Sequence, residues 1–155
     1  MVLICQILIL SILATLLATP VVRAAVPEEK TEKVAIIDAS ANMLAGDGNE
    51  TRFERAVARV KSLVTETLDG EGTVSVILAG TQASFVAQRA GSDLRRDVYE
   101  ALDNLVTPGD LKCSFAAGDV NGAMTLAEQV VNENPKAEIL FYTATTYIDK
   151  GGVQI

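Results

Sequence analysis

The sequence predicts an α/β domain: a three-layer, doubly wound, Rossmann-like sheet that is mostly parallel. Short apolar runs of strand length alternate with longer segments whose apolar residues recur every three to four positions. Such runs suit strands buried on both faces, and the longer segments suit right-handed crossover helices between parallel strands. One pair of runs is separated by too few residues for a helix, so we expect one antiparallel edge strand.

The composition limits the function. The chain has 155 residues, no histidine and a net charge of −7. Without histidine, an imidazole general base, a Ser-His-Asp triad and a histidine-ligated zinc site are excluded. An acidic chain without a basic stripe argues against nucleic acid binding. We expect neither enzyme activity nor a small-molecule substrate.

The two cysteines are expected to be free thiols. Cys5 lies in an apolar terminal run and Cys113 in a later loop, so a disulfide would need the loop to reach into that run. Lys112 could lower the pKa of the neighbouring Cys113 thiol, but without a histidine partner we interpret Cys113 as an ordinary loop residue.

The amino-terminal residues 2–22 carry no charge and consist mostly of leucine, isoleucine, valine and alanine. As a helix at about 1.5 Å per residue they would span roughly 30 Å, the thickness of a bilayer core. We therefore expect residues 1–25 to be a single-pass membrane anchor. The alternative is a cleavable signal peptide, which would leave a secreted protein. Residues 26–32 are interpreted as a linker and residues 33–155 as the domain.

The first predicted strand, residues 34–37, ends at a polar loop that we expect to hold the functional site. Asp38 follows the strand directly, at the topological switch point where open α/β sheets place their ligands. The Asp38 carboxylate and the Ser40 hydroxyl can both point into the crevice above the sheet. Oxygen atoms of this kind are ligands for Mg²⁺.

The next three elements follow from local signals. Thr51 and Glu54 fit a capping box, and apolar residues then repeat at helical spacing, so a first helix is predicted from Arg52 to Leu68. Residues 73–79 and 84–88 are predicted strands joined by a short loop. They should therefore pair antiparallel at one edge of the sheet.

The second half of the chain continues the alternation. Ser92 is predicted to cap a second helix, followed by a loop over residues 106–118. Asp119 is predicted to cap a third helix, where its charge also suits the helix dipole. Residues 137–143 form another predicted buried strand, and residues 153–155 read as the opening of a further one.

Residues 38–43, Asp-Ala-Ser-Ala-Asn-Met, resemble the Asp-x-Ser-x-Ser-Met signature of von Willebrand factor A domains. The resemblance covers residues 33–155. It also rests on Thr51-Arg52-Phe53-Glu54, on Gly118-Asp119-Val120 and on the order of the predicted helices and strands. The preceding apolar run and linker resemble the membrane-anchored, aerotolerance-type bacterial branch, which implies an extracytoplasmic domain. Because the family's domain continues for another strand, helix and strand, the resemblance implies a chain that is incomplete at its carboxyl end.

The resemblance also implies a metal-ion-dependent adhesion site, in which five side chains on three loops hold Mg²⁺ and leave a position for an acidic residue of a partner. Asp38 and Ser40 are kept, but Asn42 stands where the family has serine. Gly118 replaces a threonine, and Thr143-Ala144-Thr145 replaces Thr-Asp-Gly. We expect a degenerate site of Asp38, Ser40 and Asn42, with Asp119 as the candidate for a second carboxylate. We expect no tightly bound cofactor and at most weak Mg²⁺.

The favoured function is a membrane-anchored protein-interaction module whose strand-end surface docks a protein partner largely without metal. The expected contact residues are Asp38, Ser40, Asn42, Gly118, Thr143 and Thr145. The alternative is an Mg²⁺-dependent adhesion domain that uses the surviving first-loop ligands. A remote alternative is a phosphoryl-transfer enzyme with Asp38 as nucleophile, although Ser40 stands where such enzymes have a second aspartate. A further alternative, which assigns no specific function, is that the chain is a partial product whose sheet has one exposed edge.

Overall fold

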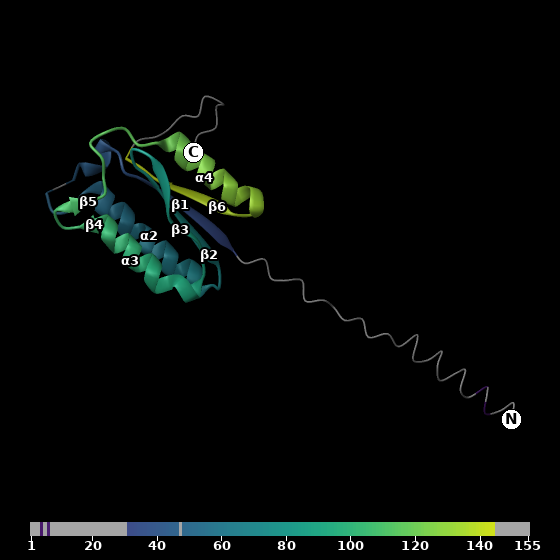
Figure 1. Ribbon diagram of the computed structural model, residues 1–155. Coiled ribbons are helices and arrows are strands. Elements are labelled where there is room, and N and C mark those ends of the chain that lie inside the picture. The colour runs from purple at the N-terminus through teal and green to yellow at the C-terminus, as the bar shows by residue number, and fades with distance from the viewer. Residues whose placement is uncertain (1–3, 5, 7–30, 47, 145–155) are drawn as a thin grey trace.

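The computed structural model describes Ile4, Gln6 and residues 31–46 and 48–144 of the chain. Figure 1 shows a sheet between helices, with a further short hairpin at one end. Within the described residues, no helix is long and apolar enough to cross a membrane. The elements in order are β1 (Glu32–Asp38), η1 (Ala41–Leu44), α2 (Arg52–Asp69), β2 (Thr73–Ala79), β3 (Ala83–Ala90), η2 (Ser92–Leu94), α3 (Arg95–Leu105), β4 (Val106–Thr107), β5 (Asp110–Leu111), α4 (Val120–Glu133) and β6 (Glu138–Tyr142).

The main sheet has four described strands in the order β3-β2-β1-β6. β1 pairs in parallel with both β2 and β6, and Ile36 lies between Ile77 and Phe141. β3 pairs antiparallel with β2, which confirms the predicted edge strand, although it extends further than the expected residues 84–88. The α/β class and the mostly parallel sheet are therefore as predicted.

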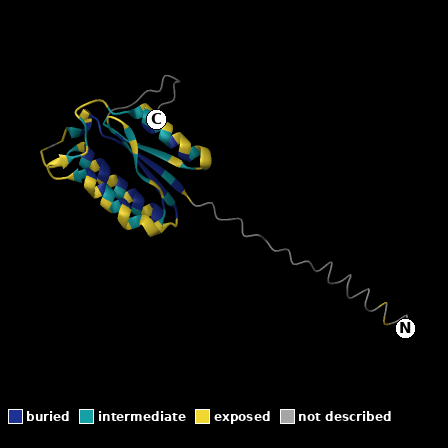
Figure 2. Ribbon diagram, viewed as in Figure 1, coloured by how far each residue is buried: buried dark blue, intermediate teal, exposed yellow. Residues whose placement is uncertain are grey.

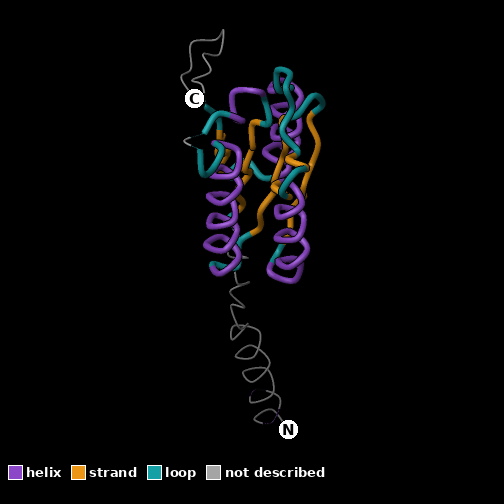
Figure 3. Tube along the Cα trace, turned by 90° about the vertical axis from the view of Figure 1, so that its left-hand side faces the viewer, coloured by secondary structure: helices purple, strands orange, loops and turns teal. Residues whose placement is uncertain are grey.

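Both faces of β1 are buried, as a short uninterrupted apolar run requires. Ala35 and Ile37 face the core cluster that β1 shares with α2 and α3, whereas Val34 and Ile36 face the cluster that it shares with α4. Figure 3 shows the strands between two layers of helices, and Figure 2 shows the buried residues concentrated along the sheet. The three-layer arrangement places the carboxyl ends of β1, β2 and β6 at one edge.

The amino-terminal end of α2 is fixed by the predicted capping box. The backbone N–H of Glu54 donates to the Thr51 hydroxyl at 3.1 Å, and the backbone N–H of Thr51 donates to the Glu54 carboxylate at 2.7 Å. The backbone N–H of Thr51, and then its hydroxyl, lower the pKa of Glu54. The helix then runs to Asp69, one residue beyond the predicted end.

Thr51→Ala is expected to lower the free energy of unfolding by about 1 kcal/mol, the usual cost of losing an N-cap side chain. The Glu54 pKa is lower in the folded state, so the stabilisation from its carboxylate is present above the unfolded pKa. It is lost as the pH falls through the folded pKa. The loss of melting temperature in Thr51→Ala should therefore be larger at pH 7 than at pH 3. Alanine keeps the backbone N–H that lowers the pKa most, so equal losses at both pH values would contradict only the contribution of the hydroxyl to the carboxylate.

Two local predictions were wrong, and one turn was not predicted. Ser92 does not cap a helix: Gly91 precedes the turn η2 without a side-chain cap, and α3 begins only at Arg95. Residues 106–118 are not all loop, because β4 and β5 form a small hairpin whose turn contains Gly109 with φ of +82°. The loop after β1 also contains a turn of 3₁₀ helix, η1, which was not predicted.

Other expectations fall on residues that the structure does not describe. The anchor or signal segment over residues 1–25 and the linker over residues 26–32 lie outside the described range, apart from Ile4, Gln6 and residues 31 and 32. Residues 145–155, including Thr145 and the expected strand opening, also lie outside it.

Candidate functional site

Asp38 lies at the carboxyl end of β1 and is fully buried. The backbone N–H of Ser40 donates to its Oδ1 at 2.9 Å, and the Thr143 hydroxyl donates to its Oδ2 at 2.8 Å. Thr143 directly follows β6, so the parallel pairing of β1 with β6 brings the two residues together. Both carboxylate oxygens therefore accept hydrogen bonds from the protein itself.

Ser40 and Asn42 border a pocket of about 360 Å³ beside this carboxylate. Ser40 is only 6% exposed, and its hydroxyl has no hydrogen-bond partner among the described residues. Asn42 lies in η1 and is exposed. The opposite side of the pocket is formed by the start of α4, and the full lining is Ser40, Asn42, Ala117, Gly118, Asp119, Val120 and Asn121.

Asp119 caps α4, which confirms its predicted role. Its Oδ1 accepts a hydrogen bond from the backbone N–H of Gly122 at 2.9 Å. Its Oδ2 accepts one from the backbone N–H of Ala83 at 3.2 Å, so the same carboxylate also ties α4 to the start of β3. The side chain that was expected as a second metal ligand is thus engaged in two structural hydrogen bonds.

Gly118 lies against the carboxyl ends of β1 and β2. A Cβ added there would lie 2.7 Å from the carbonyl oxygen of Ala79 and 3.0 Å from Asp38 Oδ1. The carbonyl of Ala79 is backbone and already accepts a hydrogen bond from the N–H of Ala39 at 3.1 Å, so it cannot simply move aside. The threonine that the resembled family has here would not fit without rearrangement.

Gly118→Ala is expected to lower the free energy of unfolding by about 2 kcal/mol, the scale of overpacking a tight site. Gly80→Ala is the matched control, because a Cβ at Gly80 has only an ordinary contact, 3.7 Å from the carbonyl oxygen of Gln82. Urea denaturation of the two variants measures the difference. Equal losses would mean that the close approach at Gly118 is relieved easily.

Two backbone hydrogen bonds join residues 114–116, in the loop before Gly118, to residues 39–41, in the loop after β1. The two bonds flank an exposed aromatic side chain. The N–H of Ser114 donates to the carbonyl of Ala39 at 2.7 Å, and the carbonyl of Ala116 accepts from the N–H of Ala41 at 3.2 Å. Phe115 lies between these two bonds and is 91% exposed. Sequence reasoning missed Phe115, because nothing in an apolar residue's local pattern shows that it faces solvent.

Cys113 packs beneath the same loop and is a free thiol, as predicted. Its thiol donates to the carbonyl of Ser40 at 3.2 Å. Burial, and then the negative charge of Asp38, raise the pKa of Cys113 to about 11. The neighbouring Lys112 instead pairs with Asp110 at 2.7 Å. Cys113 is therefore a poor nucleophile at neutral pH.

Iodoacetamide is expected to alkylate Cys113 about a hundredfold more slowly at pH 8 than an unhindered cysteine, because the thiolate is the reactive form. The pKa of about 11 makes that form correspondingly rare. The measurement uses a Cys5→Ser variant of the full chain, so that only one thiol reports, with urea-unfolded protein as the control. Equal rates in the folded and unfolded protein would contradict the raised pKa.

The structure thus brings the predicted site residues together only in part. Asp38, Ser40 and Thr143 meet through hydrogen bonds, and Gly118 approaches the Asp38 carboxylate closely. Asn42 shares the neighbouring pocket with Asp119. Among the described residues, no group of three or more histidine, cysteine, aspartate or glutamate side chains is placed to hold a metal ion.

Comparison with known proteins identifies the family of the domain. Residues 34–145 match a family model described as von Willebrand factor type A domain. The crystal structure of the conserved hypothetical protein BatB from Bacteroides thetaiotaomicron is similar, with 25% sequence identity and a TM-score of 0.50. The match covers 64% of this chain but only 45% of that one. No curated protein sequence matches this chain.

Proposed function

The chain belongs to the von Willebrand factor type A domain family, and we propose that it is a protein-interaction module that docks its partner without a tightly bound metal ion. Domains of this family generally bind other proteins. The observation that supports the proposal most is the exposure of Phe115. Its side chain is 91% exposed, two residues before Ala117, which lines the pocket bordered by Ser40 and Asn42. The hydrogen bonds of Ser114 and Ala116 fix its loop on the Asp38 loop.

An exposed aromatic ring on a fixed loop is well suited to anchor a partner. Aromatic residues are enriched among the few side chains that carry most of an interface's binding energy. Because the loop is already ordered by hydrogen bonds, binding would cost less conformational entropy than it would for a loose loop. Asn42 and the pocket beside it would supply polar contacts around the ring.

The donor atoms at Asp38 support binding without a tight metal. Mg²⁺ and Ca²⁺ need several oxygen ligands and compensating negative charge. The Asp38 carboxylate is engaged by the Ser40 N–H and the Thr143 hydroxyl. The Asp119 carboxylate is engaged by Gly122 and Ala83. One further carboxylate is missing, because Ala144 stands where the family has aspartate. This donor set does not fit a tightly held dication.

One observation favours the Mg²⁺-dependent alternative. The Ser40 hydroxyl is buried beside Asp38 and has no partner among the described residues, and buried polar atoms are normally satisfied. A weakly held cation with its waters would supply one. Thermal melts of the full chain with and without millimolar Mg²⁺, Mn²⁺ and Ca²⁺ separate the two proposals. A hundredfold excess over Kd would add about 2.7 kcal/mol of stability. A rise that Asp38→Ala abolishes would favour the metal.

Docking is tested by photo-crosslinking from the proposed surface. A photoreactive amino acid is placed at Phe115 or Asn42 of the full chain, and at Thr125, an exposed residue of α4, as the control. Crosslinks to one protein from the first two positions, unchanged by a chelator and absent from the third, are expected. Purified partner should then bind Phe115→Ser at least about tenfold more weakly, a loss of 1.4 kcal/mol. Equal affinity for both proteins would exclude Phe115 as the anchor.

We further propose that the chain belongs to the aerotolerance-type branch and is anchored by residues 2–22, with its domain outside the cytoplasm. The similarity to BatB and the uncharged composition of that segment support this proposal. Retention in the membrane pellet after alkaline carbonate extraction is expected for an anchor. Recovery in the soluble fraction, with the segment removed, would favour the cleaved signal peptide.

A further inference from the structure

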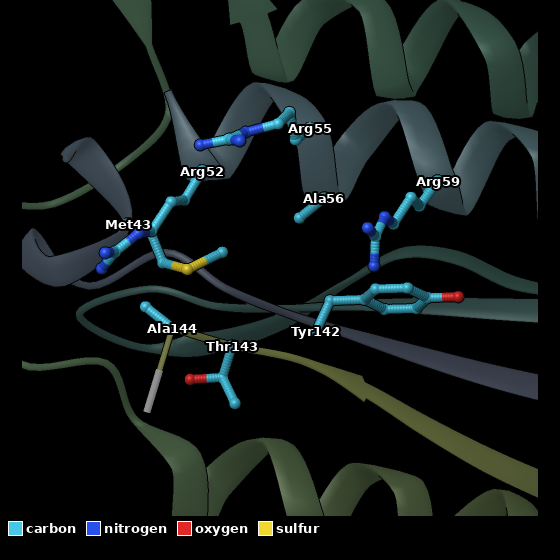
Figure 4. Close-up of a pocket in the computed structure, with 8 residues that line it drawn as sticks. All are labelled: Met43, Arg52, Arg55, Ala56, Arg59, Tyr142, Thr143 and Ala144. Carbon is cyan, nitrogen blue, oxygen red and sulfur yellow. The ribbon is translucent and has the colours of Figure 1, made fainter. Parts of the chain in front are cut away.

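A second pocket, of about 370 Å³, lies between α2 and the end of β6. Figure 4 shows arginine side chains of α2 along one side and the ring of Tyr142 on the other, with Arg59 pointing toward the ring. The lining is Met43, Arg52, Arg55, Ala56, Arg59, Tyr142, Thr143 and Ala144. It contains three arginines and no acidic residue.

The arginines share one face of α2 because their spacing is helical. Arg52, Arg55 and Arg59 are three and four residues apart, the separations that bring side chains to the same side of a helix. At about 1.5 Å per residue, the outer two are roughly 10 Å apart along the axis. Neither Arg52 nor Arg59 forms an ion pair with an acidic group among the described residues. The ion pairs of Lys61, Arg89 and Arg95 lie elsewhere.

This positive surface stands out against the rest of the molecule. The chain has a net charge of −7, so its overall field repels acidic ligands. The acidic residues that act electrostatically on Tyr142 are Glu66 and Glu138, and neither lines the pocket. Glu66 is itself paired with Lys33 at 3.5 Å. The positive charge of the pocket therefore attracts negatively charged groups, whereas the net negative charge of the rest of the molecule repels them.

The pocket borders the Asp38 site. Thr143 lines the pocket and donates its hydroxyl to Asp38, and Met43 lies in η1, one residue after Asn42. A partner seated on the strand-end surface would therefore have the arginines within reach. The two surfaces can contribute to one interface.

We propose that this pocket receives the carboxylate side chains of an acidic peptide segment on the protein partner. The inference rests on the proposed function, since it assigns a chemistry to that partner. Guanidinium groups bind carboxylates through paired hydrogen bonds, which adds geometric specificity to charge attraction. In an extended peptide, every second side chain points to the same side and neighbours on that side are about 7 Å apart, so the long glutamate and arginine side chains can bridge the span from Arg52 to Arg59. A partner with acidic residues at alternate positions of an extended segment fits the pocket.

The probe is a short fluorescein-labelled peptide in which glutamate and serine alternate, titrated against the full chain at low salt. The same peptide with glutamine in place of glutamate measures the contribution of charge. Arg52→Gln/Arg59→Gln removes the two outer arginines. Arg96→Gln removes one positive charge from α3, where the side chain is 93% exposed and outside the pocket. Thermal melts check that each variant folds.

The glutamate peptide is expected to bind at least about tenfold more tightly than the glutamine peptide. Arg52→Gln/Arg59→Gln should abolish that preference, whereas Arg96→Gln should keep it. Three results would each overturn the proposal: equal binding of the two peptides, a double variant that binds like the unmodified chain, or an equal loss in Arg96→Gln. Binding of inorganic phosphate without binding of the peptide would also overturn it, in favour of a small-anion site.

The result of the peptide titration can be distinguished from the result of the photo-crosslinking experiment. Phe115 does not line the arginine pocket, so Phe115→Ser should leave the peptide affinity unchanged. If the peptide fails while Phe115 still crosslinks to a partner, only the acidic specificity is wrong. If the peptide binds while no partner crosslinks at Phe115 or Asn42, the proposed docking surface is wrong. The proposal that the arginine pocket binds acidic peptides is then still supported.

Discussion

Asp38→Ala is expected to lower the free energy of unfolding by about 3–4 kcal/mol, since hydrogen bonds to charged groups contribute roughly 1.5–3 kcal/mol each. The substitution removes the acceptor for the N–H of Ser40 and for the hydroxyl of Thr143. Ser40 is buried, so its N–H would be left without water or another acceptor. The loss therefore includes the cost of an unsatisfied buried donor.

The measurement is urea denaturation of the unmodified chain, Asp38→Ala and Thr143→Val. Thr143→Val removes only one donor and leaves the Ser40 bond, so its expected cost is about 1.5–2 kcal/mol. Asp38→Ala protein that remains folded should still bind the partner and the glutamate peptide, because neither Phe115 nor the arginines are altered. A loss of partner binding that a chelator reproduces in the unmodified chain would instead assign Asp38 to a metal site.

The parts of the site that were predicted correctly depend on short-range signals. Asp38 directly follows an apolar run, and the end of a buried parallel strand is a fixed place in this class of sheet. Thr51 and Glu54 form the capping box that their spacing indicates, and Asp119 caps α4. Each of these follows from residues within four positions of one another.

The local errors have physical causes that the sequence partly contained. Ser92 resembles an N-cap, but the chain makes a turn of 3₁₀ helix first, so no side chain caps α3. Pro108 and Gly109 are the pair expected in a tight turn, because proline fixes φ at the first position and glycine accepts the positive φ at the second. That signal predicts the hairpin of β4 and β5, although strands of two residues have no periodicity of their own.

The two features that carry the functional proposals depend on long-range packing. Helical spacing alone places Arg52, Arg55 and Arg59 on one face of α2. That this face meets Tyr142 depends on the pairing of β1 with β6, whose partners are about a hundred positions apart in the chain. The exposure of Phe115 likewise depends on backbone hydrogen bonds that join Ser114 to Ala39 and Ala116 to Ala41, about seventy-five positions earlier in the chain. No pattern within either segment encodes these contacts.

The amino-terminal end of the sheet contains the other large electrostatic contribution. Glu32 is only 1% exposed, and its Oε2 accepts hydrogen bonds from Arg89 at 3.3 Å and from Asn134 at 3.1 Å. Its Oε1 has no hydrogen-bond partner among the described residues but lies 3.3 Å from Arg89 Nε. Arg89 holds this position with a left-handed φ of +46°, and its backbone N–H donates to the buried hydroxyl of Ser75 at 3.0 Å. One arginine thus neutralises a carboxylate that water hardly reaches.

Arg89→Ala is expected to lower the free energy of unfolding by about 3–5 kcal/mol, the cost of leaving a buried charge without its partner. Glu133→Ala is the matched control, because it removes only the exposed partner of Arg89 and should cost less than about 1 kcal/mol. Glu32→Met/Arg89→Met removes both charges of the pair, of which only Glu32 is buried, and should recover most of the loss because no buried carboxylate is left without a partner. Urea denaturation of the three variants gives the comparison. A double variant no more stable than Arg89→Ala would show that packing or the strained backbone at residue 89, and not the unpaired carboxylate, accounts for the effect.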